Sequence, residues 1–159
     1  MARHGLTHTE LAAKLLVEAS LNRIAGRESG KLPVEGARLE EAKRAELGRE
    51  PGGLTVFYPL GDGGVYMDFH DTATTIWFNG ADSSDARIRV EDELKQAYPE
   101  FVVRSDQPDP RNEKMRLRAY DIGLGNGRAA AVDIAYPGPG ANPRGFVARV
   151  LAYAVTFKN

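Results

Sequence analysis

The segment 65–79, VYMDFHDTATTIWFN, holds the side chains with the most chemistry to offer. Asp68 lies two residues before His70, and on a strand such residues point to the same face. A carboxylate beside an imidazole can orient the ring and raise its basicity, which suits a general base. Asp68 and His70 are therefore the candidate catalytic residues. The nearby indole of Trp77 offers a surface on which a ligand could stack.

The same segment predicts a β-hairpin with its turn at residues 71–74. This pairing collects the polar side chains on one face: Tyr66, Asp68, His70, Thr75, Trp77 and Asn79. The other face is apolar: Val65, Met67, Phe69, Ile76 and Phe78. The expected register has three facing pairs: His70 with Thr75, Asp68 with Trp77, and Tyr66 with Asn79. The polar face is either a site, with Tyr66, Trp77 and Asn79 as candidate ligand-binding residues, or an ordinary solvated surface, which is the commoner role.

Arg116, Arg118 and Tyr120 alternate along a run that reads as a strand, so they share one of its faces. Two guanidinium groups in a row could bind phosphate or a nucleic-acid backbone, which makes Arg116 and Arg118 candidate ligand-binding residues. Asp133 on the following strand offers them an internal partner, and internal pairing is the simpler interpretation. The formal net charge is −1, so no overall field attracts nucleic acid, and no nucleic-acid partner is expected.

Three glycines, Gly123, Gly125 and Gly127, resemble a dinucleotide-binding loop, but their spacing is G-x-G-x-G. The third glycine comes one residue early, and the stretch from there to Pro137 is too short for a crossover helix. Asn126 followed by Gly127 is instead a strong signal for a type I′ hairpin turn. The segment 26–36 also fails as a phosphate-binding loop, because its glycine spacing and its position after a helix are wrong. No cofactor is predicted.

The turn at Asn126 and Gly127 sets an expected register for this second hairpin. It places three pairs opposite one another: Leu117 with Tyr136, Ala119 with Ile134, and Asp121 with Val132. One face of the hairpin would then be apolar, and the other would carry both arginines.

Other common sites find little support. The chain has no cysteine, so disulfides, thiolate metal ligands and cysteine nucleophiles are excluded. No G-x-S-x-G elbow marks a serine nucleophile. His4 and His8 have the spacing of a metal-binding pair on a helix, but His4 precedes the expected helix and a third ligand is missing, so no metal site is predicted.

A first helix is predicted over residues 8–25, begun by a capping box of Thr7 and Glu10 and ended by Gly26. It is apolar on two sides, one of which carries Val17 and Leu21. Such a helix is usually contacted twice, by its own core and by a second element or subunit. The expected partner is therefore another protein, or a second copy of this chain, at the N-terminal helix.

The remaining elements follow from the changing periodicity. A charged surface helix is expected at 35–48, and a third helix, capped by Ser83 or Ser84, ends before Pro99. Short β-rich runs from residue 54 onward predict antiparallel strands. The final run, 146–157, suits a helix or a strand, and its β-branched and aromatic residues favour a strand in the sheet interior.

These elements predict an α+β fold: N-terminal helices packed on a mainly antiparallel sheet of about six or seven strands, with one helix between the sheet halves. Residues 1–53 form a helical segment, either part of the same domain or a docking arm, and 54–159 form the sheet core. We expect a cytoplasmic, non-catalytic module for binding or assembly, with self-association as one form of that role. The alternative is a small enzyme or ligand binder that uses the face of Tyr66, Asp68, His70 and Trp77.

Overall fold

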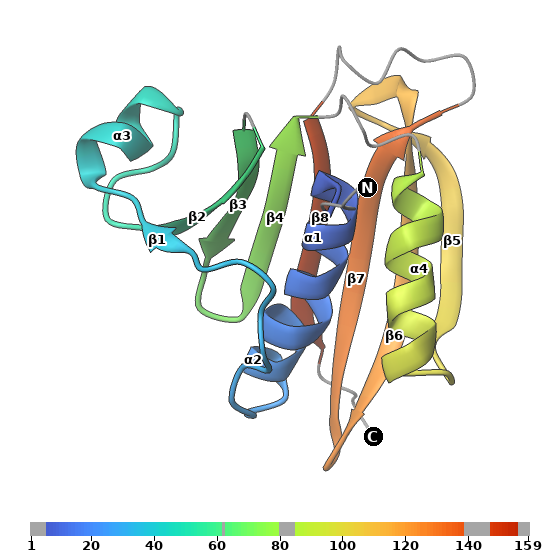
Figure 1. Ribbon diagram of the computed structural model, residues 1–159. Helices are drawn as coiled ribbons and strands as arrows, with labels where there is room; N and C mark the ends of the chain where they lie inside the picture. The colour runs from blue at the N-terminus through green and yellow to red at the C-terminus, as the bar shows by residue number, and fades with distance from the viewer. Residues whose placement is uncertain (1–5, 62, 80–84, 139–146, 156–159) are drawn as a thin grey trace, which may run out of the picture.

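The computed structural model describes residues 6–61, 63–79, 85–138 and 147–155. The fold is α+β, with helices packed on an eight-stranded antiparallel sheet (Figure 1). The helical elements are α1 (His8–Leu15), η1 (Leu16–Leu21), α2 (Asn22–Ile24), α3 (Glu41–Glu46) and α4 (Ala86–Ala97). The strands are β1 (Ala37–Arg38), β2 (Leu54–Leu60), β3 (Gly63–Phe69), β4 (Ala73–Asn79), β5 (Val102–Asp109), β6 (Asn112–Gly125), β7 (Arg128–Pro137) and β8 (Val147–Val155).

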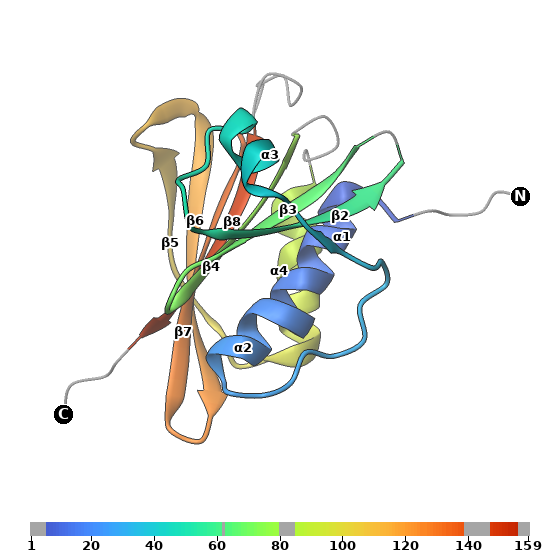
Figure 2. The ribbon, with the colours of Figure 1, turned by 90° about the vertical axis from the view of Figure 1, so that its left-hand side faces the viewer.

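The sheet order is β1-β2-β3-β4-β8-β7-β6-β5, so the last strand joins two meanders at the centre. Helix α4 connects those two halves, as expected. The sheet twists strongly, since β2 and β3 run across the view of Figure 2 while β6 and β7 run along it. The strand beyond the expected number is β1, a two-residue edge strand within the segment that was predicted to be helical.

The structure confirms the predicted start of the first helix at His8 and its end before Gly26. Thr7 Oγ1 accepts from the backbone N–H of Glu10, and the Glu10 carboxylate accepts from the backbone N–H of Thr7, which completes the capping box. Elements α1, η1 and α2 follow without a break, and η1 is a π-helical stretch within them. Gly26 takes a φ of 77°, the left-handed conformation that ends many helices.

Both apolar sides of this helix are covered within the chain. One side packs on β3, β4 and β8, and the other contacts α4 (Figure 1). Val17 is 7% exposed and Leu21 is fully buried, so neither is a surface residue. The second contact that the sequence predicted is therefore made by α4, and the expected docking of a partner on these side chains loses its basis.

The second helix is shorter than predicted. Element α3 spans only six residues, and Leu39 donates its backbone N–H to Thr55 in an extended segment before it. The side chain it buries is the charged Arg44, which is 5% exposed, although a charged surface helix was expected here. The third helix begins at Ala86 after Asp85, and the predicted serine caps at 83 and 84 lie outside the described residues.

The last described strand, β8, confirms the choice of strand over helix for this run. It lies between β4 and β7 in the sheet interior. Ala148 and Ala152 are buried on the side that carries the N-terminal helix, because small side chains let a helix approach a sheet closely. Ala154, two residues after Ala152, is exposed.

The predicted turn at Asn126 and Gly127 is also confirmed, since their φ values are 54° and 73°. The expected register, however, is wrong by one residue. An irregularity between Gly123 and Gly125 shifts the pairing, so Arg118 faces Ile134. A one-residue shift exchanges the two faces of a strand. The arginines therefore lie on the helix side of the sheet, where the sequence had placed the apolar residues.

No helix in the described part of the chain is long and apolar enough to cross a membrane.

Candidate functional site

Asp68 lies at the centre of a polar cluster on the outer face of the sheet, the face away from α1 and α4. Its side chain is 3% exposed. Thr55 Oγ1 donates to Oδ1 at 2.5 Å, and the indole Nε1 of Trp77 donates to Oδ2 at 3.0 Å. The guanidinium of Arg49 completes the set, with Nη2 2.5 Å from Oδ2. Three donors on one buried carboxylate hold it firmly in place.

Two arginines connect this cluster to the segment after β1. Arg44 Nε donates to Thr55 Oγ1 at 3.0 Å, and Nη1 donates to the Glu50 carbonyl at 2.5 Å. A Cβ at Gly53 would lie 2.5 Å from Nη2 of Arg44, so glycine permits this close approach. Arg49 follows the end of α3 and places its guanidinium carbon 5.1 Å from the centre of the Trp77 ring.

Three aromatic side chains form a row across β2, β3 and β4. Tyr66 pairs with Phe57 on one side and with Trp77 on the other. The Tyr66 and Trp77 rings stack with centroids 4.1 Å apart and planes 10° apart, and the Phe57 and Tyr66 centroids are 4.8 Å apart. All three side chains are half-buried, so the row offers a stiff aromatic surface on the outer face.

A hollow of about 510 Å³ opens beside this cluster. It is lined by residues 48–53, by Leu54 of β2 and by residues 68–70 at the end of β3. Arg44, Arg49, Asp68 and His70 contribute side chains to its lining. The lining therefore includes two arginines and one buried carboxylate that are held by hydrogen bonds and an ion pair.

The structure brings together part of the predicted set. Tyr66, Asp68 and Trp77 share the outer face, as the hairpin pattern indicated, but the register differs by two residues: Asp68 faces Thr75 and Tyr66 faces Trp77. The turn is tighter than predicted, because His70 donates its backbone N–H to the Ala73 carbonyl.

The expected pairing of a carboxylate with an imidazole is not made. His70 is exposed and lies just beyond the end of β3, and the three described donors to Asp68 are Thr55, Arg49 and Trp77. Asn79 lies two residues beyond Trp77, exposed at the end of β4 and away from Asp68. His8, the other histidine considered, has Nε2 3.0 Å from the Leu60 carbonyl, and His4 lies outside the described residues.

Three residues of the cluster were not predicted from the sequence: Thr55, Arg44 and Arg49. The position of Thr55 could have been predicted, because it alternates with Val56 and so belongs to the outer face of its strand. No sequence pattern predicted the positions of Arg44 and Arg49. They lie in and after a charged helix whose face toward the sheet is set only by tertiary packing.

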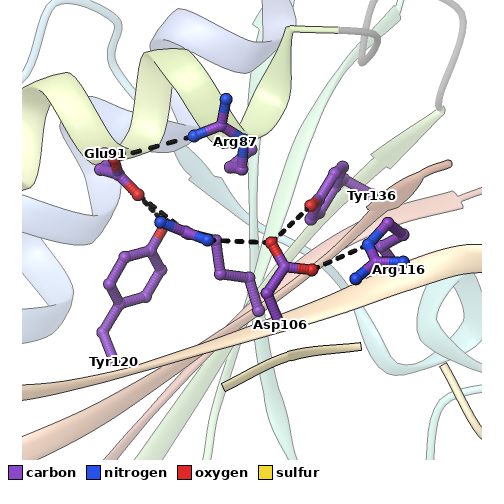
Figure 3. A network of polar contacts seen from close by, with 7 residues as sticks. Arg87, Glu91, Asp106, Arg116, Tyr120 and Tyr136 are labelled. Atoms are coloured by element: carbon purple, nitrogen blue, oxygen red, sulfur yellow. Dashed lines mark hydrogen bonds and ion pairs between the residues drawn. The ribbon is translucent and has the colours of Figure 1, made fainter. Parts of the chain in front are cut away.

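Arg116 and Arg118 belong to a second polar network, between α4 and the other half of the sheet (Figure 3). Asp106 of β5 accepts from Arg116 Nε at 2.8 Å and from Arg118 Nη1 at 2.9 Å. Tyr136 donates its hydroxyl to the same carboxylate at 2.9 Å. Internal pairing was the simpler prediction, and it is what occurs, although the carboxylate is Asp106 and not Asp133.

The network continues to α4 through Glu91. Its Oε1 accepts from Arg118 Nε at 2.9 Å and from the Tyr120 hydroxyl at 2.8 Å, while Arg87 lies 3.8 Å from its other oxygen (Figure 3). Burial raises the pKa of Tyr120, and the hydrogen bond to Glu91 raises it further. Tyr120 therefore stays a neutral donor, and the network fastens α4 to the sheet.

Asp106 is the titratable centre of this network. Burial alone would raise the pKa of its carboxyl, but the hydrogen bonds from Arg116, Arg118 and Tyr136 outweigh burial and hold the pKa below its usual range. Arg116 and Arg118 already donate to Asp106 and Glu91 within the chain, so they are poorly placed to hold a ligand.

Of the two clusters, the one around Asp68 is the better candidate site. Its carboxylate is saturated by donors and so suits a positioning role more than proton transfer. Arg49 presents a planar fork of five N–H donors, and its described hydrogen-bonding partner is reached through Nη2 alone. The arrangement can hold a ligand oxyanion at Arg49 beside a flat aromatic surface.

In comparisons with known proteins, no family model, curated protein or solved structure matches the chain.

Proposed function

We propose that this protein is a non-catalytic binding module, and that it binds a small organic anion in the hollow between residues 48–53 and the end of β3. The observation that carries the proposal is the fixed position of Arg49. Its guanidinium lies on Trp77 and against the buried Asp68 carboxylate, at the wall of a hollow of about 510 Å³. That volume lies in the range of small-molecule sites.

Preorganisation supports binding at this place. Arg49 is held by an ion pair and by the indole, so little side-chain entropy remains to be lost when a ligand binds. A guanidinium that is fixed in one plane favours bidentate contact with a carboxylate or phosphate. The exposed His70 at the same hollow adds a second group able to donate to an anion.

Binding is favoured over catalysis by the contacts of Asp68. A general base needs a lone pair directed at the substrate, whereas this carboxylate already accepts from a hydroxyl, an indole and a guanidinium. Its role in the proposal is to hold Arg49 and Trp77 in place. The catalytic alternative would require His70 to act without the orienting partner that was expected for it.

The test uses the fluorescence of Trp77, the single tryptophan of the chain. The purified protein is titrated with inorganic phosphate, sugar phosphates, nucleoside monophosphates and dicarboxylates. We expect at least one class to change the emission saturably. Arg49→Gln should weaken that binding about tenfold or more, the loss expected for a charge-assisted contact. Trp77→Leu, followed by calorimetry, should weaken binding more than it lowers stability.

The matched control is Arg89→Gln, which removes an arginine paired with Asp85 on α4, remote from the hollow. It should leave affinity unchanged. A Trp77 emission that no anion alters would contradict the proposal, and so would an Arg49→Gln protein with unchanged affinity.

A second candidate function, assembly through self-association, is favoured by one observation at the edge of the sheet. Strand β5 is an outermost strand, and it exposes Val102 by 59% and Val103 by 40%. An uncovered edge strand can pair with the same strand of a second copy. Sedimentation should then detect a dimer at micromolar concentration that Val103→Lys dissociates, and a monomer throughout would exclude this function.

A further inference from the structure

A second hollow, of about 200 Å³, lies on the outer face over β6, β7 and β8. Its apolar lining residues are Leu117, Ala135 and Leu151, and Thr75 of β4 also lines it. The charged lining residues are Arg111, Arg149 and Asp133. Opposite charges thus flank a small apolar space.

The cationic end is incompletely neutralised. Asp109, whose side chain is 1% exposed, lies 3.5 Å from Nε of Arg111 and 3.9 Å from Nη2 of Arg149. These separations exceed the 2.7–2.9 Å or so of a strong charged hydrogen bond. Asp109 also accepts from the backbone N–H of Arg111 at 2.9 Å, so it is committed to the turn between β5 and β6.

Mutual repulsion between the two arginines agrees with this geometry. Burial lowers the pKa of Arg149, and the positive charge of Arg111 lowers it further, against the opposing effect of Asp109. A second carboxylate between the guanidinium groups would relieve that repulsion and accept from both.

At the anionic end, the carboxylate of Asp133 is likewise only partly neutralised within the chain. The side chain of Asp133 is 21% exposed, and its partner Arg104 approaches to 3.4 Å while it also contacts Asp121 at 3.3 Å. Burial raises the pKa of Asp133, and the charge of Arg104 offsets this only in part. A cation bound beside Asp133 would stabilise its charged form.

The sheet fixes the distance between the two ends. Ala135 pairs with Arg149 across the strands, and Asp133 lies two residues before Ala135 on the same face. Asp133 and Arg149 are thus diagonal neighbours, a relation that separates two residues by about 7–8 Å. The described ion-pair partners of the two residues differ: Arg104 pairs with Asp133, and Asp109 lies near Arg149.

We propose that this hollow is a binding site for a small zwitterion of the amino-acid class. The ligand carboxylate is held by Arg111 and Arg149, its ammonium group by Asp133, and its aliphatic side chain by Leu117 and Leu151. The volume is below the range of about 300–1,000 Å³ that drug-sized ligands occupy, which limits the ligand to a few heavy atoms. This site shares no lining residue with the hollow that contains Arg49, although Trp77 pairs with Arg149 across β4 and β8.

Isothermal titration calorimetry with glycine, alanine, valine and leucine tests the proposal on the full chain. We expect binding to strengthen from glycine to leucine as more apolar surface is buried. Two analogues of leucine separate the contributions: 4-methylpentanoate lacks the ammonium group, and 3-methylbutylamine lacks the carboxylate. Each should bind at least about tenfold more weakly than leucine, the difference expected for one lost charged contact.

Two variants test which residue binds the carboxylate of the ligand and which binds its ammonium group. Arg149→Gln should weaken leucine and 4-methylpentanoate alike, whereas Asp133→Asn should weaken leucine and leave 4-methylpentanoate unchanged. Arg49→Gln should leave leucine binding intact, which keeps this test independent of the first proposed site. No binding of any of the four amino acids at millimolar concentration would overturn the proposal, as would equal affinity for leucine and 4-methylpentanoate or unchanged binding by both variants.

Discussion

At the scale of single residues, the charged side chains of this protein fall into two kinds. Those that are strongly bonded within the chain, such as Asp68 and Asp106, each satisfy several donors from different elements. Those with ion-pair distances above 3 Å, such as Arg149 and Asp133, line the second hollow, over β6, β7 and β8. The first kind fixes structure, because removing one partner of a buried polar group leaves the others unsatisfied. The second kind has longer internal contacts, and it is the kind on which the proposed zwitterion site depends.

Asp106 gives a pH prediction at this scale. Its pKa in the folded protein lies below the value of about 3.9 of an unfolded chain, so the carboxylate stabilises the fold above about pH 4. That contribution is lost as the pH falls through the folded pKa. Asp106→Asn should therefore lower the free energy of unfolding by on the order of 1–3 kcal/mol at pH 7.

Urea denaturation between pH 2 and pH 7 measures this effect. The difference between wild type and Asp106→Asn should shrink as the solution becomes acidic. Asp92→Asn, at an exposed position of α4, provides the control and should show little difference at any pH. A difference for Asp106→Asn that is constant with pH would contradict the ionic role of this network.

At the scale of elements, the turn between β6 and β7 shows how strongly local chemistry can determine structure. Gly127 has a φ of 73°, and among the described residues no heavy atom beyond its two chain neighbours lies within 4 Å of the position that a Cβ would occupy there. Gly123, earlier in β6, has equal space and no positive φ. The two glycines therefore differ in backbone conformation and not in room. Gly127→Val should cost about 1–3 kcal/mol through backbone strain.

Gly123→Val is the matched variant, and it should be neutral or slightly stabilising, since valine favours a strand. Thermal and urea unfolding of both proteins checks the prediction. Equal effects of the two substitutions would show that the turn conformation is not the source of the cost.

The N-terminal helix gives the next prediction at the same scale. Leu21 is fully buried and belongs to the main core, so Leu21→Glu would place an unpaired charge in an apolar environment. Leu21→Ala should cost about 2–5 kcal/mol, and Leu21→Glu should cost more and prevent stable folding. Leu21→Met, which conserves volume, should cost less than about 1.5 kcal/mol.

Circular dichroism with urea titration distinguishes this from the role in association that the sequence suggested. If Leu21→Glu stayed folded and only changed the oligomeric state, the helix would have to be a docking surface after all.

At the scale of the whole molecule, the N-terminal helix and the sheet share one apolar core. Leu11, Leu15 and Leu16 pack in the same cluster as Met67, Ile76 and Val132, which come from both halves of the sheet. Residues that share a core are expected to unfold together.

Unfolding should therefore be a single transition, with the fluorescence of Trp77 and the helical circular dichroism signal changing at the same urea concentration. A chain that begins at residue 54 should fail to fold, because the inner face of β3 and β4 would be exposed. Two separate transitions would support a helical arm that docks on an independent sheet core.

Much of this architecture could be predicted from local patterns. The capping box at Thr7, the turn at Asn126 and the alternation of Val65 with Tyr66 each depend on neighbouring residues, and each is confirmed. The α+β class followed from the same patterns. These features are local because hydrogen-bonding geometry and side-chain direction repeat along the chain with a fixed period.

Tertiary structure alone decided the rest. The bulge near Gly123 moved Arg116 and Arg118 to the helix side of the sheet, because one extra residue reverses every side chain beyond it. Arg44 is buried although its segment is highly charged, since Thr55 and the Glu50 carbonyl satisfy it from other parts of the chain. A sequence pattern shows which face of a helix or strand is apolar, but partners distant in the chain determine what covers that face and which charges meet there.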